Sequence, residues 1–197
     1  MSERKQIKVC WISAGVSSFI AGWLARSTVD EFIYIDIADQ HPDSLRFIHD
    51  CEAELGKKIT ILQNKNYHSV SDVCRARRFI KSASGAQCTE ILKRRVRKEW
   101  EYQHRDYSIT YVWGMDVNEQ DRADRLWDAM PDFQHEFPLI DKHLTKDDAH
   151  GLCYELGIKR PAMYDLGYPN NNCVGCVKGG GRILEQNSGG LPGGVCG

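Results

Sequence analysis

A run of small and hydroxyl-bearing residues near the N-terminus has the composition of an anion-binding turn. It joins the β-rich run 7–12 to a helical pattern that begins at residue 17, and it consists of Ser13, Ala14, Gly15, Val16, Ser17 and Ser18. Small side chains let backbone N–H groups approach a phosphate closely, and a helix N-terminus adds unpaired N–H groups and the positive end of its dipole. The residues alone favour a phosphate site and a ligand-free turn equally.

Two of the eight cysteines, Cys173 and Cys176, form a C-x-x-C pair in a segment without a core pattern. Two thiolates at this spacing can bind one metal centre, but they supply only half of a tetrahedral site. The alternative is a loop without a metal. In a reducing cytoplasm we do not expect a disulfide framework, so most of the other cysteines are expected to be core or surface thiols.

Charged residues at regular spacing supply further candidates. Glu119 and Arg122 lie three residues apart, so a helix would place them on one face, and the arginine fork suits a phosphate or sulfate. Asp36 ends a predicted strand, where it could accept a hydrogen bond from a ribose or an adenine amino group; a turn carboxylate is the alternative. The basic run 93–98 suits a nucleic acid or a nucleotide phosphate, and its alternative is a solvated helix face.

The elements that must position these residues alternate between strand and helix. Strand patterns cover residues 7–12, 32–37, 59–62 and 107–113, and helical patterns cover 17–26, 42–55, 70–80, 89–102, 122–129 and 146–156. This alternation predicts an α/β fold, a three-layer sandwich with a mostly parallel central sheet and helices on both faces. Ligands of such sheets bind beyond the C-terminal ends of the strands, where residues 13–18 and Asp36 would lie.

Length and composition exclude several classes of protein. With 197 residues, 42% hydrophobic and 27% charged, the chain suits one globular domain with a sizeable core. The formal net charge of −1 gives no overall field for a nucleic acid or an anionic membrane. No apolar run approaches the roughly 20 residues that span a bilayer, and no signal-peptide pattern opens the chain, so we expect a cytoplasmic protein without a membrane partner.

Five further segments, in order, carry a resemblance to a known family. They are Y-I-D-I-A-D-Q-H-P-D-S at 34–44, C-T-x-x-L-K at 88–93, G-x-x-x-x-E-x-x-R-x-x-R at 114–125, P-L-I at 138–140 with the helix start at 144–148, and 159–180 with its cysteine pair. Together with Ser13–Ser18, which is similar to the PP-loop S-G-G-x-D/S-S, they resemble the phosphoadenosine phosphosulfate reductase family of the adenine nucleotide α-hydrolase-like superfamily. The short members found in phage and mobile elements are the most similar. The resemblance covers roughly residues 6–180.

The resemblance implies a Rossmann-like fold of the HUP or PP-loop type and an adenine nucleotide, either ATP or a sulfonucleotide, bound at residues 13–18. It adds Lys93 and Gly114 as nucleotide-binding residues beside Asp36, Glu119 and Arg122. It also implies that Cys88 joins Cys173 and Cys176 as a ligand of a [4Fe-4S] cluster. Zinc is the alternative metal at these cysteines, and Mg²⁺ is a further candidate ion. Ala14 stands where the loop usually has glycine, and Ser17 where the ATP-cleaving branch often has aspartate.

The implied activity is oxidoreductase chemistry, the thiol-dependent release of sulfite from a sulfonucleotide, with a reductant such as thioredoxin as partner. The family's C-terminal cysteine motif, E-C-G-x-H, has no counterpart, since Cys196 lies in G-V-C-G. The catalytic residue is therefore left unassigned. The alternatives are an ATP pyrophosphatase that adenylates an acceptor for sulfur transfer to nucleic acid, and a nucleotide-binding module without catalysis.

The last segment, 179–197, differs in composition from the domain predicted over residues 1–178. It contains eight glycines and few aliphatic residues, which indicates a disordered tail. One codon string for residues 181–196, read one nucleotide out of register, gives G-Y-W-N-K-I-R-V-D-F-P-E-V-F, which resembles the continuation in relatives. A frameshift near residue 180 is therefore a concrete hypothesis that sequencing the gene would test.

Overall fold

The computed structural model describes residues 4–78, 81–82, 85–174 and 176, so the glycine-rich tail lies outside the described residues. The strands are β1 (Lys5–Ile12), β2 (Glu31–Ile35), β3 (Ile59–Leu62), β4 (Lys81–Ser82), β5 (Gly85–Ala86), β6 (Tyr107–Val112) and β7 (Gln134–Glu136). The α-helices are α1 (Val16–Leu24), α2 (Asp43–Leu55), α3 (Val70–Arg77), α4 (Arg95–Gln103), α5 (Gln120–Ala129), α6 (Pro138–Asp141), α7 (Lys146–Glu155) and α8 (Ala162–Asp165). A π-helix (Thr89–Arg94) leads directly into α4, and a 3₁₀ turn (Val117–Glu119) leads into α5.

Five parallel strands form the central sheet in the order β3-β2-β1-β6-β7. Cys10 of β1 lies opposite Phe32 of β2 on one side and Val112 of β6 on the other. The chain builds outward from β1 in one direction through β2 and β3, and then in the other through β6 and β7. The point where this direction reverses lies between β1 and β6, and the C-terminal ends of these two strands flank the crevice in which such sheets bind ligands. The predicted α/β fold class with a parallel sheet is confirmed.

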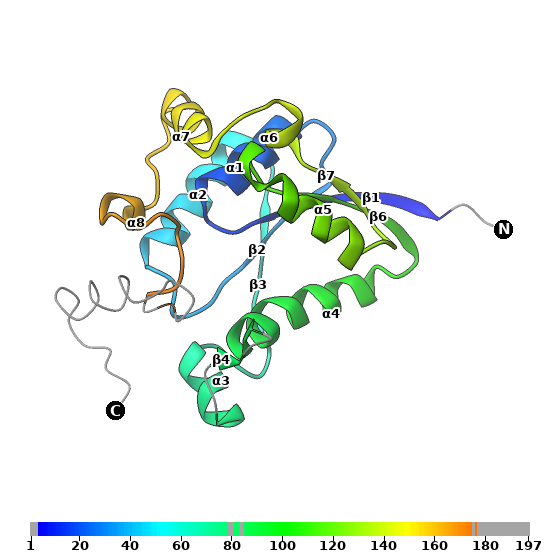
Figure 1. Ribbon diagram of the computed structural model, residues 1–197, viewed down its shortest axis with the longest axis vertical. Coiled ribbons are helices and arrows are strands. Elements are labelled where there is room, and N and C mark those ends of the chain that lie inside the picture. The colour runs from blue at the N-terminus through cyan, green and yellow to red at the C-terminus, as the bar shows by residue number, and fades with distance from the viewer. Residues whose placement is uncertain (1–3, 79–80, 83–84, 175, 177–197) are drawn as a thin grey trace.

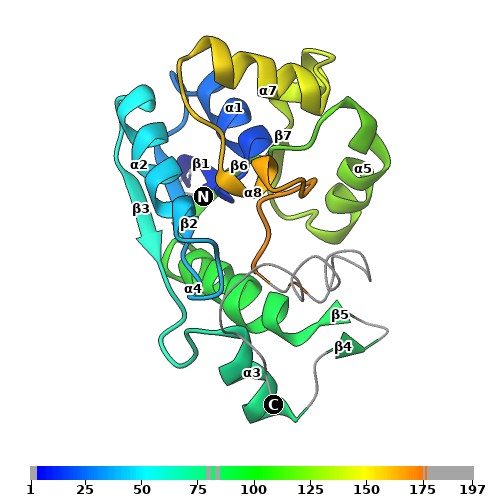
Figure 2. The same ribbon diagram turned by 90° about the vertical axis from the view of Figure 1, so that its left-hand side faces the viewer.

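Helices cover both faces of the sheet, as the alternation of side chains along β1 requires. Cys10 and Ile12 point into the larger core, which contains α1, α2 and α7. Val9 and the partly buried Trp11 point to the opposite face, where Trp100 of α4 packs. The two views show the layers: α1, α2 and α7 lie together on one side of the sheet and α4 on the other (Figures 1 and 2).

Local signals fix most helix ends as expected. Gly56 ends α2 in the left-handed region at φ 62°, and capping boxes begin α3 at Ser69 and α7 at Thr145. The expected basic helix 89–102 is divided into the π-helix and α4, a difference that periodicity cannot reveal. Strand β7 and the short helices α6 and α8 were not expected. In the described part of the chain, no helix has both the length and the apolar character needed to span a membrane.

Candidate functional site

The turn after β1 is closed by its own side chains. Ser13 donates its backbone N–H to Ser18 Oγ at 3.0 Å, and Ser18 Oγ donates to the Gly15 carbonyl at 2.8 Å. Gly15 is the N-cap of α1 without a side-chain cap, and Ala14 holds the left-handed φ of 57°. The turn therefore bends sharply and presents the first N–H groups of α1, which have no partner within a helix, toward the C-terminal edge of the sheet.

Gly114 lets this turn lie close to the neighbouring strand. A Cβ atom at Gly114 would lie 2.4 Å from Ser18 Cα and 2.6 Å from Ser18 N. These distances are far below an ordinary carbon contact of about 3.5–4.0 Å. The end of β6 and the first turn of α1 therefore touch backbone to backbone, which only glycine allows, and this contact sets the floor of the crevice.

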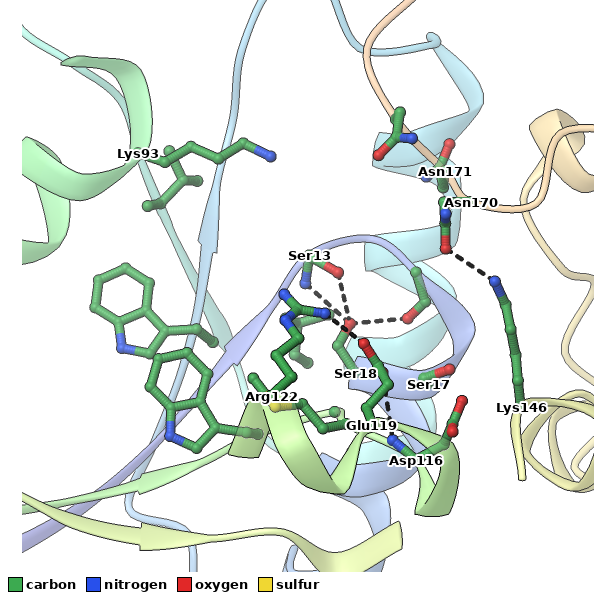
Figure 3. Close-up of a pocket in the computed structure, with 18 of the residues that line it drawn as sticks. Ser13, Ser17, Ser18, Lys93, Asp116, Glu119, Arg122, Lys146, Asn170 and Asn171 are labelled. Carbon is green, nitrogen blue, oxygen red and sulfur yellow. Dashed lines mark hydrogen bonds and ion pairs between the residues drawn. The ribbon is translucent and has the colours of Figure 1, made fainter. Parts of the chain in front are cut away.

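A cavity of about 730 Å³ opens at this crevice (Figure 3). Its volume lies within the usual range of about 300–1,000 Å³ for small-molecule sites. The strand ends and loops supply Trp11, Ile12, Ser13, Gly15, Ile35, Gln40, Trp113, Gly114, Met115, Asp116, Asn170, Asn171 and Asn172. The helices supply Ser17, Ser18, Thr89, Lys93, Arg94, Arg97, Glu119, Arg122, Lys146 and Tyr164.

Positive charge outweighs negative charge around the cavity, with five Lys and Arg side chains against two carboxylates. Arg122 pairs with Glu119 at 2.5 Å through one of its nitrogens, which leaves the rest of the guanidinium available. Lys93 extends into the cavity in Figure 3 and forms no ion pair with any described residue. The site can therefore attract an anionic ligand at the N-terminus of α1.

Two of the other cationic side chains at the cavity, Arg97 and Lys146, are held by contacts with other protein groups. Arg97 lies 3.2 Å from Glu101 and packs on the face of Tyr111. Lys146 donates to the Pro169 carbonyl and, at 2.8 Å, to Asn170 Oδ1. These contacts hold α4 and the segment after α8 at the rim of the cavity.

Most of the nucleotide-binding residues named from the sequence lie around this one cavity. They are Ser13, Gly15, Ser17, Ser18, Lys93, Gly114, Glu119 and Arg122. Ala14 and Val16 are fully buried beneath the loop. Asp36 does not line the cavity: its N–H donates to the Leu62 carbonyl at 2.9 Å, and its carboxylate accepts a hydrogen bond from Gln63 at 2.7 Å. Its contact with a nucleotide stays a prediction.

The three cysteines lie near one another without forming a metal site. Cys88 and Cys173 pack beside the same apolar cluster, and the N–H of Cys176 donates to the Cys173 carbonyl at 3.1 Å. Burial raises the pKa of the Cys173 thiol to about 11, although the nearby Lys93 ammonium lowers it. No three or more His, Cys, Asp or Glu side chains among the described residues are grouped to hold a metal ion. The iron–sulfur cluster and zinc therefore have no support here and stay predictions.

Sequence reasoning missed the residues that the C-terminal segment brings to the loop. The amide of Asn171 donates to the Ala14 carbonyl at 2.7 Å and to Ser44 Oγ at 3.1 Å. Tyr164 accepts a hydrogen bond from the Val16 N–H at 3.4 Å. The unusual run Asn170–Asn172 was a polar signal that could have marked this segment, whereas nothing in the spacing marked Tyr164.

Comparison with solved structures places this arrangement among known proteins. The structure is similar to the crystal structure of phosphoadenylyl-sulfate (PAPS) reductase from Candida auris in a phosphate complex, with a TM-score of 0.60 over 86% of this chain and 82% of that one. The chain has the fold of a PAPS reductase. The two sequences are 11% identical, so the likeness concerns the fold. The sequence matches no protein-family model, and the search of curated proteins found none with significant similarity.

Proposed function

We propose that this chain binds an adenine nucleotide through the loop Ser13–Ser18 and catalyses the thiol-dependent reduction of a sulfonucleotide. One observation carries the proposal: the N-terminus of α1, Lys93 and Arg122 border a single cavity at the switch point of a PAPS reductase fold. A helix N-terminus and two cations around one cavity suit the phosphate groups of such a substrate.

The reaction needs a thiolate and a stabilised leaving group. The thiolate attacks the sulfur of the sulfonucleotide and the S–O bond to the phosphate breaks, which leaves a thiosulfonate and the nucleotide. A second thiol then attacks the carbon-bearing sulfur of this thiosulfonate, so that a disulfide forms and sulfite departs with the electron pair of the broken S–S bond. A dithiol reductant of the thioredoxin kind supplies the two electrons. Negative charge grows on the leaving phosphate, where the first-turn N–H groups of α1 and the Arg122 guanidinium stabilise it.

The second candidate is ATP-dependent adenylation of an acceptor, with release of pyrophosphate. Two carboxylates at the cavity, Asp116 and Glu119, favour it, because Mg²⁺ bound to nucleotide phosphates is usually held by one or two carboxylates. A nucleic-acid acceptor would meet the basic run 93–98, of which Lys93, Arg94 and Arg97 border the cavity.

Product analysis separates the two reactions. Purified protein is incubated with PAPS and reduced thioredoxin, and in parallel with MgATP, and sulfite and pyrophosphate are measured. We expect sulfite from PAPS. Pyrophosphate from ATP without sulfite from PAPS would replace reduction with adenylation. Nucleotide binding without either product would leave a binding module.

Two arginines of α5 offer a matched test of binding. Arg122 borders the cavity and Arg125, one turn later, is an exposed residue outside its lining. We expect Arg122→Ala to weaken the affinity for adenosine 3′,5′-bisphosphate by roughly tenfold or more, since a hydrogen bond to a charged group contributes about 1.5–3 kcal/mol. Arg125→Ala should leave the affinity unchanged in calorimetric titration. Equal losses in the two variants would remove Arg122 from the proposed site.

A further inference from the structure

Tyr164 joins the C-terminal segment to the loop at the start of α1. It belongs to α8, its ring packs edge-on against His150 with centroids 4.6 Å apart, and its side chain borders the cavity. A Cβ atom built on Gly15 would lie 3.4 Å from the Tyr164 hydroxyl, which is contact distance. The hydroxyl therefore lies directly at the N-terminus of α1.

A backbone N–H group of α1 donates to this hydroxyl. The Val16 N–H lies 3.4 Å from the phenol oxygen. A phenol oxygen has two acceptor lone pairs and one donor hydrogen. The hydroxyl thus acts as an acceptor toward the loop, and its hydrogen is left to find an acceptor.

That acceptor is missing from the described part of the chain, in which the Tyr164 hydroxyl donates to no residue. The Tyr164 side chain is half-buried and borders the cavity, so the hydrogen is expected to point into the cavity, where a ligand oxygen can accept it. Burial also raises the pKa of Tyr164, which keeps the hydroxyl protonated and able to donate at neutral pH.

We propose that Tyr164 is a ligand-binding residue whose hydroxyl donates a hydrogen bond to a phosphate or sulfate oxygen at the N-terminus of α1. This inference rests on the proposed nucleotide function and adds to it a residue that discriminates between charged and uncharged ligands. Because the hydroxyl accepts from Val16 while the side-chain amide of Asn171 donates to the Ala14 carbonyl, the C-terminal segment is also fixed to the loop.

The test compares two probes, ATP and adenosine, on Tyr164→Phe. Phenylalanine keeps the ring on His150 and removes only the hydroxyl. We expect the affinity for ATP to fall by roughly tenfold or more and the affinity for adenosine to stay within twofold, since only ATP carries the anionic oxygens. Tyr154→Phe is the matched control, because Tyr154 on α7 is 85% exposed and does not border this cavity.

The outcomes separate this inference from the proposed function. If the wild-type chain binds neither ATP nor adenosine 3′,5′-bisphosphate, the proposed function falls. If the wild type binds ATP and Tyr164→Phe keeps the same ATP-to-adenosine ratio, the role of Tyr164 falls and the function stands. Equal losses for both probes would also overturn it, because they indicate a purely structural role. Should Tyr164→Phe fail to fold by circular dichroism, Tyr164→Leu, which also has no donor, is measured for the same ratio. An unchanged ratio refutes the inference, and a reduced one supports it.

Discussion

Replacing Gly114 by alanine tests whether the contact between β6 and α1 builds the site. The new Cβ would lie 2.4 Å from Ser18 Cα and 2.6 Å from Ser18 N, and both of these atoms are backbone. An ordinary contact of about 3.5–4.0 Å requires the two elements to separate by roughly 1.1–1.6 Å. No side chain can rotate to relieve the overlap, so the first turn of α1 must shift as a whole.

The magnitude follows from this geometry. Overpacking costs about 1–3 kcal/mol where side chains can adjust, and a backbone overlap belongs at the upper end, near about 3 kcal/mol. For a chain of this size each kcal/mol moves the Tm by about 2–4 °C, so Gly114→Ala should lower it by roughly 6–12 °C. The affinity for adenosine 3′,5′-bisphosphate should also fall, because the displaced N–H groups no longer converge on one point.

Gly151 offers the same chemical change with the opposite expectation. It lies inside α7, and a Cβ there would meet nothing within 4 Å. Alanine in a helix interior is favoured over glycine by about 0.5–1 kcal/mol, so Gly151→Ala should raise the Tm by roughly 1–4 °C. Both variants are compared with the wild type by calorimetric melting and by titration with adenosine 3′,5′-bisphosphate. A Gly114→Ala protein with wild-type Tm and affinity would refute the close contact.

Two further substitutions test the loop and its surroundings. Ala14→Gly should stabilise the fold by about 0.5 kcal/mol in urea unfolding, because relief of the left-handed φ (about 1–2 kcal/mol) exceeds the loss of one buried methyl (about 0.8 kcal/mol). Ala149→Gly, at a buried site within α7, is the control and should destabilise the fold. A loss of stability in both variants would contradict backbone strain at Ala14. Hydrogen bonds from Arg46 lower the pKa of Asp43, so this carboxylate contributes stability that is present above its ordinary pKa of about 3.9 and is lost as pH falls through the lower, folded value. Asp43→Asn should therefore show a smaller loss of unfolding free energy than the wild type between pH 5 and pH 2, whereas parallel curves would exclude this contribution.

The sequence revealed the strands and helices whose patterns arise from their own residues. The strand 59–62 was predicted with its observed bounds, and the helix over 42–55 with its observed end, since apolar runs and the glycine after Leu55 are local signals. Strand β7, with the sequence Gln-His-Glu, has no such signal and exists because it pairs with β6. The π-helix escaped detection for a similar reason, because apolar spacing over six residues does not separate it from an α-helix.

The site could be predicted only where chemistry follows from neighbouring residues. Ser13 to Ser18 could be named as candidates because six consecutive residues make the turn, and their contact with a nucleotide stays a prediction. Tyr164 and Asn171 reach this turn from about 150 positions away, and their role depends on how α8 packs, which no spacing encodes. Asp36 lies outside the lining of the cavity although its neighbour Ile35 borders it, and its carboxylate accepts a hydrogen bond from Gln63, so its contact with a nucleotide stays a prediction.

The π-helix before α4 makes the lining of the cavity sensitive to the number of residues in this one turn. A π turn accommodates extra residues relative to an α turn, and Lys93 and Arg94 lie within it while Arg97 follows. Because the extra residue is taken up within this wide turn, deleting it would narrow the turn at Lys93 and Arg94 and leave the helical geometry of α4 in place. The deletion of one residue would thus move side chains that border the cavity without changing their charge.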